Sequence, residues 1–186
     1  MPVGRYLIYA ALAVGGCAAD LLTKQVVFDW RGWPGEQPIW WLVEGYVGIE
    51  TSLNRGALFG MGSGFGLVFA GLSFLAAGGI LAWLFYYRAA NDLWLTIALG
   101  CITGGILGNL YDRLGFWHDP AIISPEYCSA VRDWILLRYK DHTWPNFNIA
   151  DSLLVTGACL LMLHAWVRRE PTNPPHATGD DDRVGE

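Results

Sequence analysis

Four stretches of the chain are uncharged, or nearly so, over the length that a membrane-spanning helix requires. A helix needs about 20 mainly apolar residues to cross the hydrocarbon core of a bilayer. The stretches cover roughly residues 4–22, part of 56–87, 93–111 and 147–167. The first holds Asp20 near its end and the fourth holds Asp151 near its beginning. The pattern predicts four transmembrane helices, and the spacing of Gly104 and Gly108 predicts close contact between two of them.

The charges that flank these helices indicate their orientation. An even number of spans places both termini on one side of the membrane, together with the short connection 88–92. The cations nearest to that side are Arg5, Arg88, Arg168 and Arg169. Because Lys and Arg accumulate in cytoplasmic loops, we expect both termini in the cytoplasm and residues 23–60 and 112–146 on the outer side.

The first outer segment has the pattern of a strand pair. Residues 39–53, IWWLVEGYVGIETSL, are rich in β-branched and aromatic residues that partly alternate with polar ones, which predicts a short sheet. Nearby tryptophans are Trp30, Trp33, Trp40 and Trp41. Indole rings prefer the membrane interface, so this loop should lie on the bilayer. The predicted fold is mainly α and integral to the membrane, with four transmembrane helices, a small extracytoplasmic β-sheet element and a membrane-lying loop.

Composition supports a membrane protein and excludes a nucleic-acid binder. Hydrophobic residues make up 53% of the chain and charged residues only 16%, which is too apolar for an ordinary soluble domain. The net charge of -5 lacks the basic face that phosphate binding requires. Residues 170–186 are rich in proline, glycine and aspartate and predict a disordered cytoplasmic tail. Residues 1–169 then form a single four-span domain.

The N-terminal stretch has a second interpretation. The sequence VGGCAAD, with Cys17 at its centre, resembles the end of a cleaved lipoprotein or export signal. The apolar run continues into Leu21 and Leu22, and three further spans follow. A retained first span is therefore favoured.

Polar side chains collect at the outer ends of the predicted spans. They are Asp20 and Lys24 on the first span, Asn54 and Arg55 before the second, Asn109, Asp112 and Arg113 on the third, and Asn148 and Asp151 on the fourth. Ionisable groups at membrane depth are costly and usually face a protein interior or a wet cavity where they have a task. We therefore expect one polar cluster near the outer interface.

Each part of this cluster also has a structural interpretation. Asp20 and Lys24 are as well explained by an ion pair that anchors the first helix as by a functional role. For Asp112 and Arg113, a structural salt bridge is favoured over direct chemistry. Asp151 could be a helix N-cap, but the apolar pattern already includes Phe147–Ala150, so a catalytic or transport carboxylate is favoured.

Five sequence blocks resemble those of the lipoprotein signal peptidases, also called signal peptidase II. They are ADLLTK (19–24), NRGALFG (54–60), GGILGNLYDRLG (104–115), VRDWI (131–135) and FNIAD (147–151). The resemblance implies an aspartyl endopeptidase of the bacterial inner membrane, with its active site near the outer face. Its implied substrate is a prolipoprotein whose cysteine carries diacylglycerol, cleaved just before that cysteine. Membrane lipid is an implied partner, and no cofactor or metal is implied.

The resemblance also implies which residues form the site. The two catalytic aspartates of the family correspond to Asp133 and Asp151. The supporting positions correspond to Asp20, Lys24, Asn54, Gly56, Asn109, Asp112, Arg113 and Asn148. The chain departs from the family in residues 114–130, LGFWHDPAIISPEYCSA, which are longer than the usual link and include Asp119. We call this segment the insert. The flanking Val131 and Trp134 favour Asp133 over Asp119.

Two adjacent carboxylates suffice for peptide hydrolysis, since like charges in a poorly solvated site share one proton and so provide a base and an acid. The sequence does not say which aspartate is protonated. The histidines His118, His142, His164 and His176 match no triad or zinc spacing, and neither do Cys17, Cys101, Cys128 and Cys159. The alternative functions are a small proton-linked transporter subunit and an assembly protein that binds a partner through its tryptophan loop.

Overall fold

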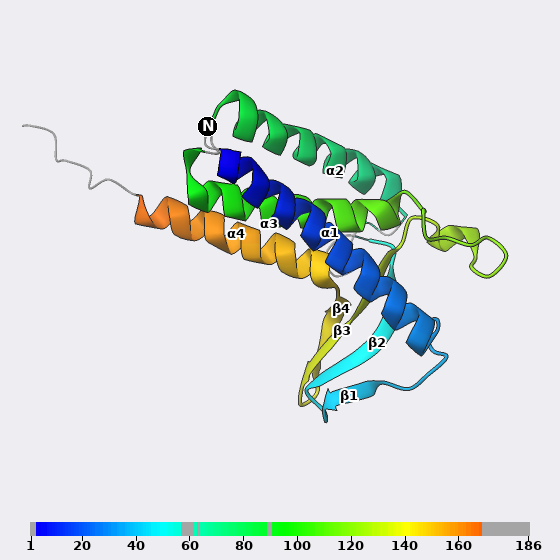
Figure 1. The fold of residues 1–186 in the computed structure, drawn as a ribbon. Coiled ribbons are helices and arrows are strands. Elements are labelled where there is room, and N and C mark those ends of the chain that lie inside the picture. Colours follow the sequence, from blue (N-terminus) through cyan, green and yellow to red (C-terminus); the bar gives the residue numbers. More distant parts are fainter. Residues whose placement is uncertain (1–2, 57–61, 63, 89–90, 169–186) are drawn as a thin grey trace, which may run out of the picture.

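A computed structural model describes residues 3–56, 62, 64–88 and 91–168 of the chain. Its helices are α1 (Val3–Arg31), α2 (Gly66–Leu81), α3 (Leu93–Arg113) and α4 (Ile149–Val167). A π-helical turn, η2 (Ala82–Tyr86), extends α2 to the length of a membrane span. The four helices lie side by side (Figure 1) and each is long and apolar enough to cross a bilayer. The prediction of four transmembrane helices is confirmed, while the predicted tail 170–186 lies outside the described residues.

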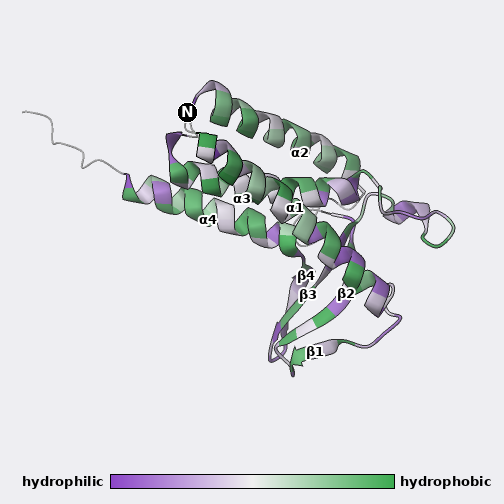
Figure 2. Cartoon of the chain, in the orientation of Figure 1, coloured by the Kyte–Doolittle hydropathy of each residue, from purple (hydrophilic) through white to green (hydrophobic). Residues whose placement is uncertain are grey.

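Helix α3 is the centre of the bundle and packs against α1, α2 and α4. Glycines permit the close approach of these helices. A Cβ atom on Gly104 would lie 3.0 Å from the carbonyl oxygen of Leu12 in α1, and one on Gly157 in α4 would lie 2.7 Å from the carbonyl oxygen of Ala98. The predicted close contact at Gly104 is thus confirmed. Residues of α1, α2 and α4 are mainly apolar (Figure 2), and many of their large apolar side chains are exposed, as lipid requires.

Helix α1 is longer than the sequence pattern predicted. The apolar run ends near Leu22, but the helix continues to Arg31. Its last turns bury Lys24, Val27 and Phe28, whose spacing continues one helical face, and this part packs against β2 and β3 of the outer sheet. Assigning Trp30 to an outer loop was therefore wrong, because this residue lies on α1.

The outer sheet has four antiparallel strands in the order β1-β2-β3-β4. The first two, β1 (Trp40–Val43) and β2 (Val47–Asn54), fall within the segment where a sheet was predicted. Gly45, with a φ of 74°, forms the left-handed turn between them. The other two, β3 (Val131–Tyr139) and β4 (His142–Phe147), come from the second outer segment, for which no strand was predicted. They bring the VRDWI block into the sheet.

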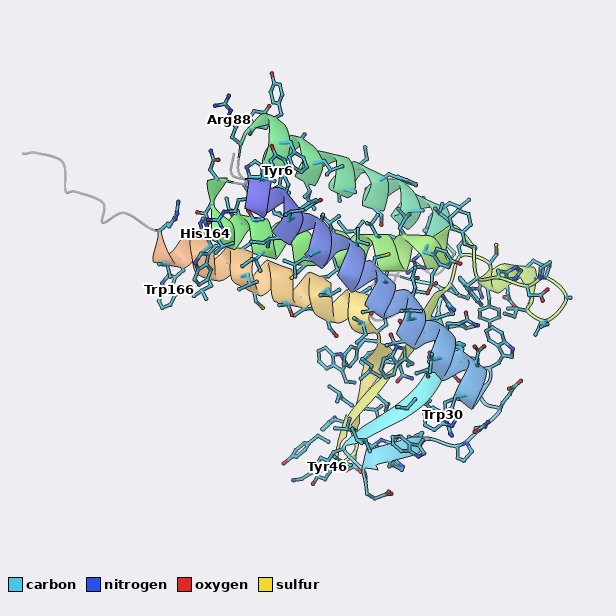
Figure 3. All side chains as sticks on the ribbon, viewed as in Figure 1. Tyr6, Trp30, Tyr46, Arg88, His164 and Trp166 are labelled. Atoms are coloured by element: carbon cyan, nitrogen blue, oxygen red, sulfur yellow. The ribbon has the colours of Figure 1, made fainter. Side chains whose placement is uncertain are left out.

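At the end of the bundle away from the sheet, polar side chains join α3 to α4. Figure 3 places Tyr6, Arg88, His164 and Trp166 at one end, and Trp30 and Tyr46 at the end that carries the sheet. At the first end, Asp92 caps α3 by accepting a hydrogen bond of 2.8 Å from the backbone N–H of Trp94. Its second oxygen lies 2.9 Å from His164 Nε2 and 2.6 Å from an Arg168 nitrogen. His164 is in α4, and Arg168 is the C-cap of that helix. This contact ties α3 to α4 far from the sheet.

Candidate active site

Three chain segments meet where the helices join the sheet. The β2–β3 pairing sets Ser52 opposite Asp133 and Asn54 opposite Val131, so two blocks about 80 residues apart in sequence become neighbours. Helix α4 begins directly after β4 and delivers Asp151 in its first turn. These residues surround a cavity of about 1220 Å³. Its polar lining includes Asn54, Arg55, Gly56, Asn109, Arg113, Asp133 and Asp151.

Asp133 lies on the cavity wall in a poorly solvated position. Its side chain is 2% exposed, and its Oδ1 accepts a hydrogen bond of 2.7 Å from Asn148 Nδ2. Burial, and secondly the negative charge of Asp151, raise the pKa of Asp133 from 3.8 to about 8. Hydrogen bonds from Asn148 and Asn54 and the charge of Lys24 offset part of this effect. The shift favours a protonated carboxyl group at this position.

Asp151 lines the same cavity from the first turn of α4. Its Oδ1 accepts a hydrogen bond of 2.8 Å from Asn109 Nδ2, and its Oδ2 accepts one of 3.3 Å from the backbone N–H of Asn148. Asn148 is the N-cap, and its side chain accepts from the Asp151 backbone N–H at 2.9 Å. The N-cap is therefore Asn148 and not Asp151, so the disfavoured alternative for Asp151 is excluded; its carboxylate completes the capping box.

Two asparagine amides connect the carboxylates. Asn148 Nδ2 donates to Asp133 Oδ1 and also to Asn109 Oδ1, the latter at 3.1 Å. Lys24 Nζ donates to the same Asn109 oxygen at 3.0 Å. Because both of these donors reach the Asn109 carbonyl oxygen, its NH₂ group is directed towards Asp151. The amides thus fix the orientation of both carboxylates relative to each other.

A buried ionic network supports these amides from behind. Lys24 Nζ lies 2.7 Å from Asp20 Oδ2 and 3.1 Å from Asp112 Oδ2, and an Arg132 guanidinium nitrogen lies 2.9 Å from Asp112 Oδ1. Two cations balance two anions, as burial of charges requires. Asp20 also accepts a hydrogen bond of 2.9 Å from the Ala150 backbone N–H. The ion pair that was one of two interpretations of Asp20 and Lys24 is present, and the hydrogen bond from Ala150 to Asp20 joins α1 to the start of α4.

The salt bridge predicted between Asp112 and Arg113 is wrong. Asp112 pairs with Lys24 and Arg132 instead, because the two neighbouring side chains leave α3 in different directions. Arg113 donates to the backbone carbonyls of Ser129, at 3.0 Å, and of Gly56. It also donates to the carbonyl of Asn54 at 3.3 Å. Arg113 therefore holds the end of the insert and the end of β2 against α3.

The structure separates the two alternative aspartates. Asp119 is exposed in the insert, where its Oδ1 accepts the Ala121 backbone N–H at 2.9 Å, and it does not line the cavity. Two residues that support the site, Arg132 and Trp117, were not predicted. The Trp117 indole N–H donates to the carbonyls of Asp112 and Ala130, at 3.1 Å each. Period-two alternation could have signalled Arg132, since the residue before Asp133 on a strand must point to the opposite face.

The described residues contain no group of three or more His, Cys, Asp or Glu side chains arranged to hold a metal. A bundle of membrane helices, an outer sheet and a cavity lined by two carboxyl groups fit a membrane-embedded peptidase. Residues 12–167 match the family described as signal peptidase (SPase) II, and the chain belongs to that family. The transporter and assembly-protein alternatives are set aside by this membership.

Individual relatives agree with this assignment. The lipoprotein signal peptidase of Rhodopirellula baltica is 53% identical over 184 residues, covering 98% of this chain and 81% of that protein. The lipoprotein signal peptidase of Symbiobacterium thermophilum is 30% identical over 158 residues, covering 85% and 93%. A solved bacterial membrane enzyme structure shares the fold with a TM-score of 0.69 at 21% identity, covering 94% of this chain and 96% of that one.

Proposed function

We propose that this chain is an aspartyl endopeptidase that removes the signal peptide from diacylglyceryl-modified prolipoproteins, cleaving before the lipidated cysteine. The observation that carries the proposal is the placement of Asp133 and Asp151 on one cavity, joined through the amides of Asn148 and Asn109. The high pKa of Asp133 fits a carboxyl pair that shares one proton. The names of the relatives supply the substrate class.

The first chemical step adds water to the scissile carbonyl. Ionised Asp151 takes a proton from water while the water oxygen bonds to the carbonyl carbon. Protonated Asp133 donates its proton to the carbonyl oxygen, so a neutral tetrahedral diol forms. Each carboxyl group has then exchanged its protonation state with the other.

The second step breaks the C–N bond. Asp151 returns its proton to the leaving nitrogen, and Asp133 takes a proton from one hydroxyl as the C=O double bond re-forms. The products are the carboxylic acid of the signal peptide and the free amine of the lipidated cysteine. The pair returns to its starting protonation state without any covalent intermediate on the enzyme.

The cavity wall also suits a substrate that is held in a membrane. Leu154 and Val155 of α4 line it on the side of the helices, and Glu50 and Asn146 line it on the side of the sheet. Signal peptide and acyl chains would lie against the apolar wall. We further propose that the termini are cytoplasmic and that the sheet end of the bundle lies at the outer face of the bacterial inner membrane.

The direct test is cleavage of a synthetic prolipoprotein peptide that carries a diacylglyceryl cysteine, by the protein purified in detergent. The parent protein should release the signal peptide, with the new amino terminus at the modified cysteine. Asp133→Asn and Asp151→Asn should lose cleavage by a factor of at least about 100, while the matched control Asp119→Asn should keep it. Full activity of Asp133→Asn would overturn the two-aspartate mechanism.

A further inference from the structure

The insert reaches the cavity. It leaves the end of α3 and extends as an arm beyond the bundle before it enters β3 (Figure 1). Within it a short 3₁₀ helix, η4 (Pro125–Tyr127), ends at Tyr127. The Tyr127 side chain lines the same cavity as Asp133 and Asp151. The insert, which lengthens the connection between α3 and β3, therefore forms part of the cavity wall.

Contacts from Arg55 fix this part of the insert. Its guanidinium carbon lies 5.3 Å from the centre of the Tyr127 ring, within the range of a cation–π contact. One guanidinium nitrogen lies 2.9 Å from Glu126 Oε2. Arg55 itself stands between Asn54 and Gly56, whose carbonyls Arg113 holds. The insert is thus attached to a loop that borders the site.

This side of the cavity is open to water. The side chains of Arg55 and Glu126 are 35% and 51% exposed. The wall formed by Leu154 and Val155 belongs to a membrane helix and is apolar. In the proposed reaction the apolar signal peptide and the acyl chains lie on the lipid side, whereas the chain that follows the modified cysteine extends into water.

We propose that Tyr127 with the Arg55–Glu126 pair forms a subsite for the hydrophilic polypeptide that follows the lipidated cysteine, and that Glu126 keeps this subsite neutral so that acidic and basic sequences are accepted alike. The proposal rests on the function proposed above. Glu126 neutralises Arg55, so the subsite of the parent protein carries little net charge. Removing the Glu126 carboxylate leaves a cation on the cavity wall, which attracts acidic and repels basic substrate residues.

Three diacylglyceryl peptides test this subsite. They are identical except for the two residues after the modified cysteine, which are Asp-Asp, Ser-Ser or Lys-Lys. The quantity measured is the ratio of kcat/KM for the acidic peptide to that for the basic peptide. Glu126→Gln should raise this ratio about three- to fivefold, the scale of an exposed ion pair, and 0.5 M salt should reduce the change.

Tyr127→Ala tests the ring separately. It should raise KM for all three peptides roughly tenfold and leave kcat within about twofold, because the ring contacts substrate away from the reacting atoms. Asp119→Asn, an exposed acid in the same insert, is the matched control and should leave both the ratio and KM unchanged.

The outcomes separate this inference from the proposed function. If the parent protein cleaves all three peptides and Glu126→Gln leaves the charge ratio unchanged, the subsite is wrong and the peptidase function stands. If the parent protein cleaves none of them, the proposed function itself fails. Glu126 is half exposed, so its replacement does not endanger folding, and thermal unfolding of each variant checks this directly.

Discussion

Replacing Asp133 with asparagine should make the protein more stable while abolishing its activity. Asparagine matches the shape of the protonated carboxyl group, and its oxygen can still accept the hydrogen bond that Asn148 Nδ2 donates to Asp133 Oδ1. Its NH₂ group replaces the acidic O–H as a donor. What the substitution removes is a carboxyl group whose pKa is 3.8 when exposed and about 8 in the folded protein.

The size of the effect follows from proton linkage. A carboxyl group whose pKa is higher in the folded than in the unfolded protein does not reduce stability at a pH below its unfolded pKa. As pH rises from the unfolded to the folded pKa, the free energy of unfolding falls, and above the folded pKa the loss is constant. At pH 7, about three pH units above the unfolded value, Asp133 lowers the free energy of unfolding by about 4 kcal/mol relative to a group that stays neutral. At pH 5 the difference is about 2 kcal/mol, and above pH 8 it stops growing.

Thermal unfolding in detergent micelles, followed by tryptophan fluorescence between pH 5 and 9, measures this difference. Asp133→Asn should unfold roughly 10 °C above the parent protein at pH 7, with a smaller difference at pH 5. The control Asp119→Asn alters an exposed carboxyl and should match the parent protein throughout. A variant that is less stable than the parent at pH 7, or a difference that does not change with pH, would refute the linkage argument.

Three further outcomes are expected. The kcat/KM of the parent protein should fall as pH rises through about 8, because Asp133 must hold its proton to act as the acid; a rate that is flat to pH 10 contradicts this. Cleavage should persist after prolonged treatment with EDTA, and loss that zinc or magnesium restores would require a metal in the mechanism. Arg132→Met leaves Asp112 without its guanidinium partner and should reduce the free energy of unfolding by about 3–5 kcal/mol. Thermal unfolding measures this loss. An unchanged unfolding temperature would show that Lys24 alone balances the charge of Asp112.

The sequence predicted the helices well because lipid imposes a simple rule. Every span must be apolar and long enough, so uncharged runs alone locate α2, α3 and α4 closely. The end of α1 escaped this rule because its last turns leave the bilayer and pack on protein. There the signal changes from a continuous apolar run to a helical face that includes Lys24 and Phe28.

The site was only partly predictable for a different reason. Single motifs showed which polar residues collect at one level, but strand pairing across about 80 residues decides which of them meet. Nothing in the local pattern of 131–147 required two strands, and pairing with β2 is what sets Asp133 beside the Asn54 segment. The partners of Asp112 likewise depend on α1 and β3 reaching α3 together.

Asn148 is the single residue between the last strand and the last helix. This junction has no linker to absorb movement, so any tilt or rotation of α4 within the lipid is transmitted to the sheet through one residue. The Asn148 side chain donates a hydrogen bond to Asp133 in the sheet and accepts one from the backbone N–H of Asp151 in the first turn of α4. The position of Asp151 relative to Asp133 therefore depends on Asn148. A force from the membrane that moves α4 acts on both aspartates through this residue.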